Sequence, residues 1–327
     1  MTIDLNKIKL PTTVFLFTFF ILAFVQLKMV ENPMLIAERF WKGRGWIQLT
    51  IIAVYGAIVA WKMQDPKNVP AWRRNTWLFF SIVFFSQLIL GLLGAEKFLM
   101  TGKLHLPIPM MIIGGPIHRL QLSFMSILFV STIALTGPAW CSHLCYFGAM
   151  DNLSARGKTK ISKLKNQRAI KATGLIIIVT TALILRWLNV PVLYTTLIAA
   201  AFGLGGIAVM IIYSRKIKKM VHCTMYCPVG TIVNLVKPVN PFRMYIDSKC
   251  DLCMKCTSYC KYDALNYTNI QNKKPGFNCT YCGDCLSACP HSSIKYKFFK
   301  LSPQASRNLY LLLTISLHAA FLALAKI

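Results

Sequence analysis

Seven long apolar stretches restrict the fold of this chain more than any other feature of its sequence. A bilayer-spanning helix needs roughly 20 predominantly apolar residues, and each stretch meets or approaches that length. The expected spans are Thr13–Lys28, Ile47–Trp61, Trp77–Ala95, Leu120–Thr136, Ala172–Leu188, Val192–Tyr213 and Asn308–Ala325. Ile47–Trp61 is the shortest, and without it the chain has six. The sequence therefore predicts an α-helical polytopic membrane protein with about seven transmembrane helices.

Composition supports a membrane protein and explains the strong positive charge. Of the 327 residues 55% are hydrophobic and only 14% are charged, less than a soluble protein carries. The net charge of +27 would also suit a nucleic-acid-binding protein, but no helix-turn-helix or RNA-binding signature accompanies it. Membrane proteins concentrate Lys and Arg in cytoplasmic loops, and this raises their net charge. We therefore predict no nucleic-acid partner.

The basic loops predict an orientation. Lys and Arg are dense in residues 156–171 and 215–219, after the fourth and sixth spans, whereas the turn Asn189–Pro191 is uncharged. The positive-inside rule places the two basic loops in the cytoplasm. It follows that the N-terminus, which begins a retained anchor, and the cysteine-rich region after residue 243 are cytoplasmic. The loop 96–119 and the C-terminus are then outside. Val30–Gly45 is the exception, because this outer loop carries Arg39, Lys42 and Arg44.

Twelve cysteines fall into four short motifs, a pattern typical of metal sites and not of a secreted disulfide framework. Eight form two runs with the spacing C-x-x-C-x-x-C-x-x-x-C, 29 residues apart, as in bacterial ferredoxins. The last cysteine of each ferredoxin run ligates the other cluster. The first predicted 4Fe–4S cluster therefore takes Cys250, Cys253, Cys256 and Cys289. The second takes Cys279, Cys282, Cys285 and Cys260.

Zinc is the alternative ligand for these runs, but zinc sites use two cysteines per knuckle and not four at a repeated spacing. Pro290 follows Cys289 as the ferredoxin pattern expects, whereas Lys261 stands in the equivalent position after Cys260. This departure leaves all eight ligands in place. The region from 243 to 300 is predicted to be an α+β two-cluster ferredoxin-like domain.

The other four cysteines form a duplicated C-x-x-x-C pair, Cys141 with Cys145 and Cys223 with Cys227, at an offset of 82 residues. The repeat extends to Gly148 and Gly230 and to Asn152 and Asn234, as expected for a repeated structural unit. Three interpretations stay open: buried thiols that pack as small hydrophobes, a redox disulfide, or four thiolates that hold a further Fe–S centre. His143 and His222 lie beside the pairs.

These motifs resemble the NapH/NosR-type membrane polyferredoxins over about residues 120–297. Cys223-Thr-Met-Tyr-Cys227-Pro228 matches the family's C-x-x-x-C-P motif fully, whereas Tyr146 replaces the proline after Cys145. The resemblance implies an electron-transfer subunit that passes electrons between the quinol pool of a bacterial cytoplasmic membrane and other redox subunits. It also implies a division into an N-terminal transmembrane region (1–119), a duplicated membrane core (120–242), the ferredoxin domain (243–300) and a C-terminal helix (301–327).

Two further hypotheses concern what the membrane part binds. The outer loop 96–119 carries Lys103, His105 and His118, which are candidate contacts for a quinone head group, although such a loop is more often a connector. A b-type haem is disfavoured because only His318 lies well inside a predicted span and bis-histidine ligation needs pairs. The alternative to respiratory electron transfer is a redox-active maturation or regulatory factor, similar to the CcoG-type polyferredoxins.

Overall fold

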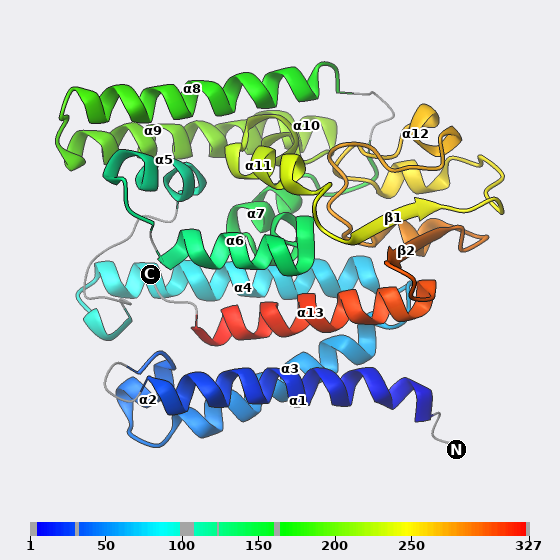
Figure 1. Cartoon of the computed structure of the whole chain (residues 1–327), viewed down its shortest axis with the longest axis horizontal. Coiled ribbons are helices and arrows are strands. Elements are labelled where there is room, and N and C mark those ends of the chain that lie inside the picture. The colour runs from blue at the N-terminus through cyan, green and yellow to red at the C-terminus, as the bar shows by residue number, and fades with distance from the viewer. Residues whose placement is uncertain (1–4, 30–32, 99–107, 123, 160–163, 325–327) are drawn as a thin grey trace.

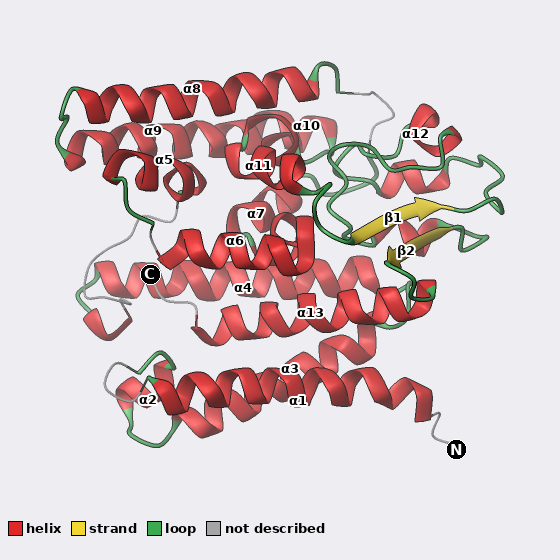
Figure 2. Cartoon of the chain, in the orientation of Figure 1, coloured by secondary structure: helices red, strands yellow, loops and turns green. Residues whose placement is uncertain are grey.

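The computed structural model describes residues 5–29, 33–98, 108–122, 124–159 and 164–324. It is a bundle of long helices with a small two-stranded region at one end (Figure 1, Figure 2). Lys103 and His105 lie outside the described residues. The helices are α1 (Leu5–Lys28), α2 (Ile36–Phe40), α3 (Gly45–Met63), α4 (Val69–Leu92), α5 (Pro109–Arg119), α6 (Phe124–Thr136), α7 (Tyr146–Ser154), α8 (Gln167–Trp187), α9 (Val192–Val209), α10 (Arg215–Ile217), α11 (Pro228–Val236), α12 (Tyr267–Gln271) and α13 (Pro303–Leu324).

All seven expected spans are confirmed as helices that are long and apolar enough to cross a membrane. They are Ile8–Lys28, Gly45–Met63, Val69–Leu92, Ser126–Leu144, Gln167–Trp187, Val192–Ile217 and Pro303–Leu324. The chain is therefore a multi-pass membrane protein. The uncertain second span is a 19-residue helix, α3, whose small residues Ala53 and Gly56 are buried in the bundle. A small residue allows close packing of neighbouring helices, and the position of a Cβ on Gly56 is 3.4 Å from Val14 of α1.

The ends of the helices alternate between two faces of the bundle (Figure 1). The start of α1 and the two-stranded region lie at the same end, whereas the α8–α9 turn and the last turn of α13 lie at the opposite end. This arrangement matches the relative sides that the basic loops predict. Which side is cytoplasmic stays a prediction.

Part of the segment 96–119 that we expected as an outer loop forms a helix, α5, which is not one of the seven candidate spans. Pro at the first turn fixes a helical φ, and the apolar residues that follow Pro109 give the helix a face to bury. Met110 and Ile113 are buried against α8, α9 and their neighbours. α5 therefore belongs to the packed bundle.

The two-stranded region is built from β1 (Phe242–Ile246) and β2 (Ile294–Phe298), which pair antiparallel with Phe242 opposite Phe298 and Ile246 opposite Ile294. Alternate residues of β1 are buried, as expected for a strand with one face on a core. The eight ferredoxin-type cysteines lie on the chain between the two strands. The sheet thus closes the cysteine-bearing loops into one unit before α13 begins.

Candidate iron–sulfur sites

Two cavities in the region between β1 and β2 are each lined by four cysteines. The cysteines that line the first cavity define site A: Cys250, Cys253, Cys256 and Cys289. The cysteines that line the second define site B: Cys279, Cys282, Cys285 and Cys260. Each cavity therefore combines three cysteines of one run with the last cysteine of the other run. This is the exchange that the ferredoxin spacing predicts.

The backbone of the two sites is duplicated as well as their cysteines. Leu252 and Met254 in site A and their counterparts Tyr281 and Gly283 in site B all have positive φ values, between 57° and 82°. Non-glycine residues rarely adopt this conformation, and such strain persists where the surroundings demand it. It turns each C-x-x-C-x-x-C loop around its cavity, so that three thiols face one space.

Backbone N–H groups point at the fourth thiol of each run. The N–H of Ala264 donates to Cys260 Sγ at 3.3 Å, and the N–H of Ser293 donates to Cys289 Sγ at 3.2 Å. Burial raises the pKa of the Cys260 thiol to about 12, and the Ala264 N–H acts against that rise. N–H donors to cluster sulfurs are among the groups that set the reduction potential of Fe–S proteins.

The duplicated C-x-x-x-C pairs are brought together by two identical turns. In each copy the chain leaves a membrane helix through a π-helical turn, Trp140–Leu144 or His222–Tyr226. The turn closes with a hydrogen bond from the N–H of the second cysteine to the carbonyl five residues earlier, at 3.0 Å for Cys145 and 2.8 Å for Cys227. π-Helical turns are rare and often occur at functional sites. A short helix follows each turn, α7 or α11.

The second cysteine of each pair is the N-cap residue of that short helix. Backbone N–H groups of the first helical turn favour a thiolate there: those of Gly148 and Phe147 act on Cys145, and those of Gly230 and Val229 act on Cys227. Burial has the larger effect and raises the pKa of both thiols. The helix N-termini thus offer partial positive charge to two thiolates in an otherwise apolar place.

The four thiols of the two pairs define site C: Cys141, Cys145, Cys223 and Cys227. Cys141 and Cys227 are buried in one hydrophobic cluster, with Cys145 packed against it. Burial, the Asp151 carboxylate and the other three thiols all raise the pKa of Cys223, so the four sulfurs lie within electrostatic range of one another. Gly230 permits this approach, because a Cβ at that position would be 3.1 Å from the Cys223 carbonyl and 4.0 Å from Cys141 Sγ.

A buried lysine faces site C. Lys171 of α8 is 2% exposed, and its ammonium donates to Asn278 Oδ1 at 2.9 Å and to the Gly230 carbonyl at 3.4 Å. Within the described parts of the chain it forms no ion pair with a carboxylate. A buried charge is costly unless an opposite charge accompanies it. Thiolates bound to iron would supply that negative charge.

Sites B and C share one hydrophobic cluster. Cys260, Cys279 and Cys282 of site B and Cys223 of site C all pack against a buried group that includes Trp77 and Tyr262. The Tyr262 hydroxyl donates to the Cys141 carbonyl at 2.7 Å, and the Trp77 indole N–H donates to the Cys145 carbonyl at 2.9 Å. Aromatic side chains therefore lie between sites B and C, and one hydrogen bond, from Tyr262 to the Cys141 carbonyl, links the two cysteine-bearing segments.

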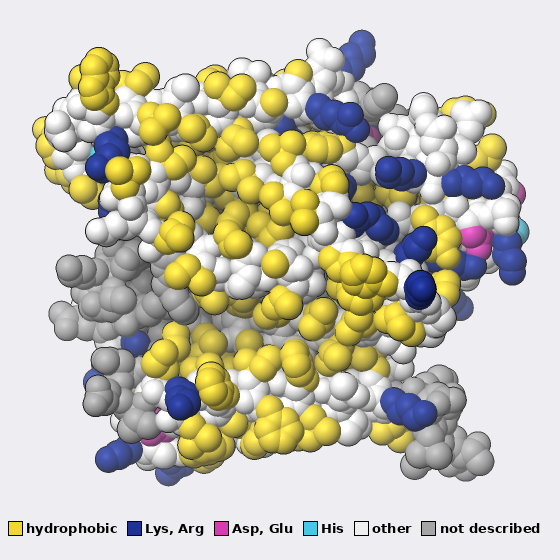
Figure 3. Space-filling model, viewed as in Figure 1, with side chains coloured by type: hydrophobic (Ala, Val, Ile, Leu, Met, Phe, Trp, Pro, Cys, Tyr) yellow, Lys and Arg dark blue, Asp and Glu magenta, His cyan; other side chains and the backbone are white. Residues whose placement is uncertain are grey.

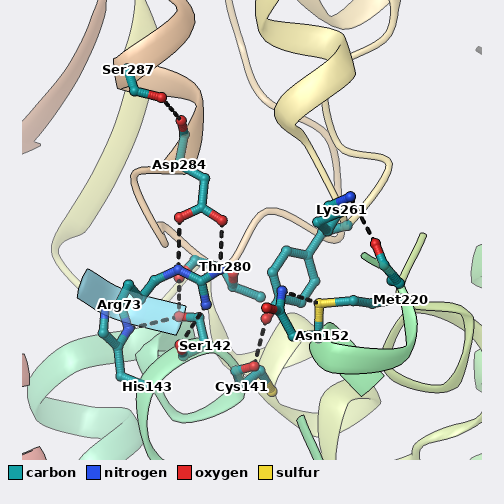
Figure 4. A network of polar contacts seen from close by, with 12 residues as sticks. Arg73, Cys141, Ser142, His143, Asn152, Met220, Lys261, Thr280, Asp284 and Ser287 are labelled. Carbon is teal, nitrogen blue, oxygen red and sulfur yellow. Dashed lines mark hydrogen bonds and ion pairs between the residues drawn. The ribbon is translucent and has the colours of Figure 1, made fainter. Parts of the chain in front are cut away.

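Arg73 of α4 makes polar contacts with the loops of both site B and site C. Its guanidinium, 1% exposed, forms a bidentate ion pair with Asp284 in the site B loop, at 2.7 and 2.5 Å, and donates to the Ser142 carbonyl in site C at 3.0 Å (Figure 4). The sequence did not predict a role in these sites for Arg73, Trp77 or Lys171. Arg73 and Lys171 lie just outside the expected spans, where basic residues are common, so the sequence holds no signal for either one.

Lys261, the departure from the ferredoxin pattern, anchors the two-stranded region to the membrane core. Its ammonium donates to the carbonyls of Ala155, Gly157 and Lys218, and its own carbonyl accepts the N–H of Met220 at 3.0 Å. A proline in this position could make none of the side-chain bonds. The neighbouring Asp263 adds an ion pair with Lys219 at 2.6 Å.

The structure describes one of the three candidate quinone contacts. His118, the only one of the three that is described, lies near the end of α5, and its carbonyl accepts a hydrogen bond from Arg186 at 2.6 Å. Its Nε2 atom is buried without a hydrogen-bond partner. His318 of α13 instead bonds Tyr55 of α3 through Nε2 at 3.1 Å and the carbonyl of His143 through Nδ1 at 2.9 Å.

Among the described residues, no three His, Cys, Asp or Glu side chains are arranged to hold a single metal ion. A cubane cluster makes a different demand, because its thiolates bind four separate irons and stand farther apart than the ligands of one ion. The cysteine-lined cavities of sites A and B suit that wider spacing.

Comparison with known proteins assigns iron–sulfur chemistry to the duplicated membrane unit. The family model described as "4Fe-4S binding domain" matches residues 120–163 and 196–240, which contain the two halves of site C. An uncharacterized protein of Methanocaldococcus jannaschii is 24% identical over 177 residues, a match that covers 50% of this chain and 66% of that protein, so about a third of the relative lies outside it. No solved structure matches the chain. A 4Fe–4S binding domain and seven apolar helices together indicate a membrane protein with iron–sulfur cofactors, consistent with electron transfer.

Proposed function

We propose that this chain is a membrane-bound electron-transfer protein whose sites A, B and C each hold a 4Fe–4S cluster. The observation that carries the proposal is the lining of the two cavities, where each set of three cysteines is completed by the last cysteine of the other run. A 4Fe–4S cluster bound in such a site accepts and donates one electron. Bond-making chemistry is not part of the proposal.

Site C is included for three reasons. The family model for 4Fe–4S binding matches both of its halves. The two halves present four cysteines on two equivalent turns. Lys171 and the N-termini of α7 and α11 supply positive charge toward the thiols, which favours thiolate ligands.

The positions of the three sites define a path for electrons through the protein. Site A contains Cys253, the one exposed cysteine of the twelve, whereas site B shares packing with site C, and site C lies at the ends of the membrane spans. Electrons would thus pass between a protein at site A and a membrane-embedded acceptor or donor beyond site C. Following the NapH/NosR resemblance, we propose the quinol pool of a bacterial cytoplasmic membrane for that role, with site A in the cytoplasm.

Anaerobic purification, followed by iron and acid-labile sulfide analysis with EPR, tests the metal content. About twelve irons per chain are expected for three cubanes, and about eight if sites A and B alone are filled. The double variant Cys223→Ser/Cys227→Ser should lose about four irons and leave the coupled signal of sites A and B unchanged. Zinc without sulfide would overturn the proposal.

A second experiment tests the quinol assignment. Reduced quinol added to the anaerobic protein should reduce its clusters, and Cys223→Ser/Cys227→Ser should prevent this. Clusters that respond to dithionite but not to quinol would favour the maturation or regulatory alternative over respiratory electron transfer.

A further inference from the structure

The surface around site A is basic and carries the exposed cysteine of the chain. Residues 243–300 contain nine Lys and Arg residues and four Asp residues. Dark blue side chains are spread over this end of the molecule, and few magenta ones accompany them (Figure 3).

Each of the four Asp carboxylates of this region already has a basic or imidazole partner. Asp263 and Asp284 pair with Lys219 and Arg73 of the membrane core, and both pairs are buried. Asp247 pairs with Lys295, and Asp251 bonds His291 at 3.0 Å. What remains toward solvent is a set of exposed lysines that form no ion pair with any carboxylate that the structure describes: Lys249, Lys255, Lys273, Lys274, Lys297 and Lys300.

Two of these lysines are neighbours of site A cysteines in the sequence. Lys249 directly precedes Cys250, and Lys255 lies between Cys253 and Cys256. Between them Leu252 is 39% exposed beside the exposed Cys253. A small apolar centre with a charged rim is the usual composition of a transient protein interface. Complementary charge at the rim mainly raises the rate of association.

We propose that the surface of Lys249, Leu252, Cys253 and Lys255 docks an acidic one-electron carrier protein, whose carboxylates surround its own redox centre. The proposal rests on the electron-transfer function proposed above. The docked carrier loses one electron and site A gains one, so no bond is formed or broken. The carrier would approach from the same side as the basic loops and avoid the membrane helices altogether.

The competing reading is that these lysines contact anionic lipid head groups, as basic residues beside a membrane often do. The exposed Cys253 of site A favours a protein partner, because contact with lipid head groups would not require a redox site at the surface. The experiment below separates the two readings.

Stopped-flow reduction of the purified protein by reduced flavodoxin, an acidic one-electron carrier, tests the proposal. The rate should fall steeply with ionic strength, and Lys249→Glu/Lys255→Glu should slow it about tenfold or more at low salt, since steering of this kind contributes roughly 10- to 1000-fold. Lys300→Glu, an equally exposed lysine at the turn before α13, should change the rate little.

Dithionite reduction in the same variants is the control for the clusters themselves. If dithionite bleaches no iron–sulfur absorbance in the unaltered protein, the proposed function fails. If dithionite works and Lys249→Glu/Lys255→Glu reacts with flavodoxin as fast as the unaltered protein, the docking surface alone is overturned. If reconstitution of the protein into phosphatidylglycerol vesicles removes the difference in flavodoxin rate between Lys249→Glu/Lys255→Glu and the unaltered protein, the docking surface is likewise overturned in favour of the lipid reading.

Discussion

The hydroxyl of Tyr262 donates a 2.7 Å hydrogen bond to the carbonyl of Cys141. Tyr262 stands two residues after a cysteine of site B, and Cys141 is itself a cysteine of site C. This bond therefore gives a short covalent and hydrogen-bonded connection between a site on the two-stranded region and a site in the membrane core. It also fixes how far apart the two sites are held.

Replacing Tyr262 by Phe should loosen this connection without opening a cavity. We expect weaker magnetic coupling between the centres in sites B and C and slower electron exchange between them, with the iron content unchanged. EPR relaxation measurements and rapid freeze-quench EPR after photoreduction would detect both effects. Tyr296→Phe is a matched control, because Tyr296 is equally buried beside site B and donates an equally short bond, 2.7 Å, to the Tyr281 carbonyl, away from site C. Equal behaviour of the two variants would refute the special role of Tyr262.

Removing Arg73 should destabilise the contact between the two-stranded region and the membrane core. Arg73→Met leaves the buried Asp284 carboxylate unpaired, and breaking a buried pair in this way costs roughly 3–5 kcal/mol. Arg73→Met/Asp284→Asn removes both charges and should recover much of the loss. Thermal unfolding in detergent measures each variant. A double variant no more stable than Arg73→Met would contradict the paired role of these side chains.

Gly148 should not tolerate a side chain. A Cβ there would overlap the Trp77 ring and lie 3.2 Å from the Cys141 carbonyl, neither of which can move without disturbing site C. Overpacking of this kind typically costs about 1–3 kcal/mol, so Gly148→Ala should lower the melting temperature and the iron retained in site C. Gly174→Ala on α8, where a Cβ meets nothing within 4 Å, should be neutral or slightly stabilising.

Lys171 should tune site C more than it stabilises the fold. Lys171→Met removes the positive charge that faces the four thiols, so the site C centre should become harder to reduce and its midpoint potential should fall, as measured by EPR-monitored redox titration. Lys171→Arg keeps the charge and should retain most of the potential. Lys165→Met removes an exposed lysine upstream of α8 and serves as the control. A potential unchanged in Lys171→Met would show that the ammonium acts only in packing.

Much of this architecture could be read from the sequence because it is encoded locally. The seven spans follow from runs of apolar residues, and the cysteine spacing already contains the crossed sharing of Cys260 and Cys289 that the two cavities display. The 82-residue repeat likewise predicts that Gly148 and Gly230 have the same role, and each packs against the carbonyl of the first cysteine in its own pair.

What the sequence could not provide is long-range pairing. Arg73 and Asp284 are 211 residues apart, and nothing in the local pattern of either one indicates the other. The sequence showed only that Lys261 stands where the ferredoxin pattern has a proline. It could not show the contacts of Lys261, because the three carbonyls that accept its hydrogen bonds lie more than 40 residues away. The helix α5 was not predicted within the expected outer loop 96–119, because its apolar face is buried by helices distant in sequence.

α13 begins five residues after β2 ends and returns the chain to the membrane, and Tyr310 on its first turns donates to the Thr280 carbonyl at 3.3 Å beside site B. The two-stranded region is thus held at both ends and clamped by Lys261 and Arg73. A region attached in this way cannot move away from the membrane core as a carrier domain on a flexible tether does. Under the proposed function, the rate of electron transfer through the protein would then depend on how often a partner protein docks on this region.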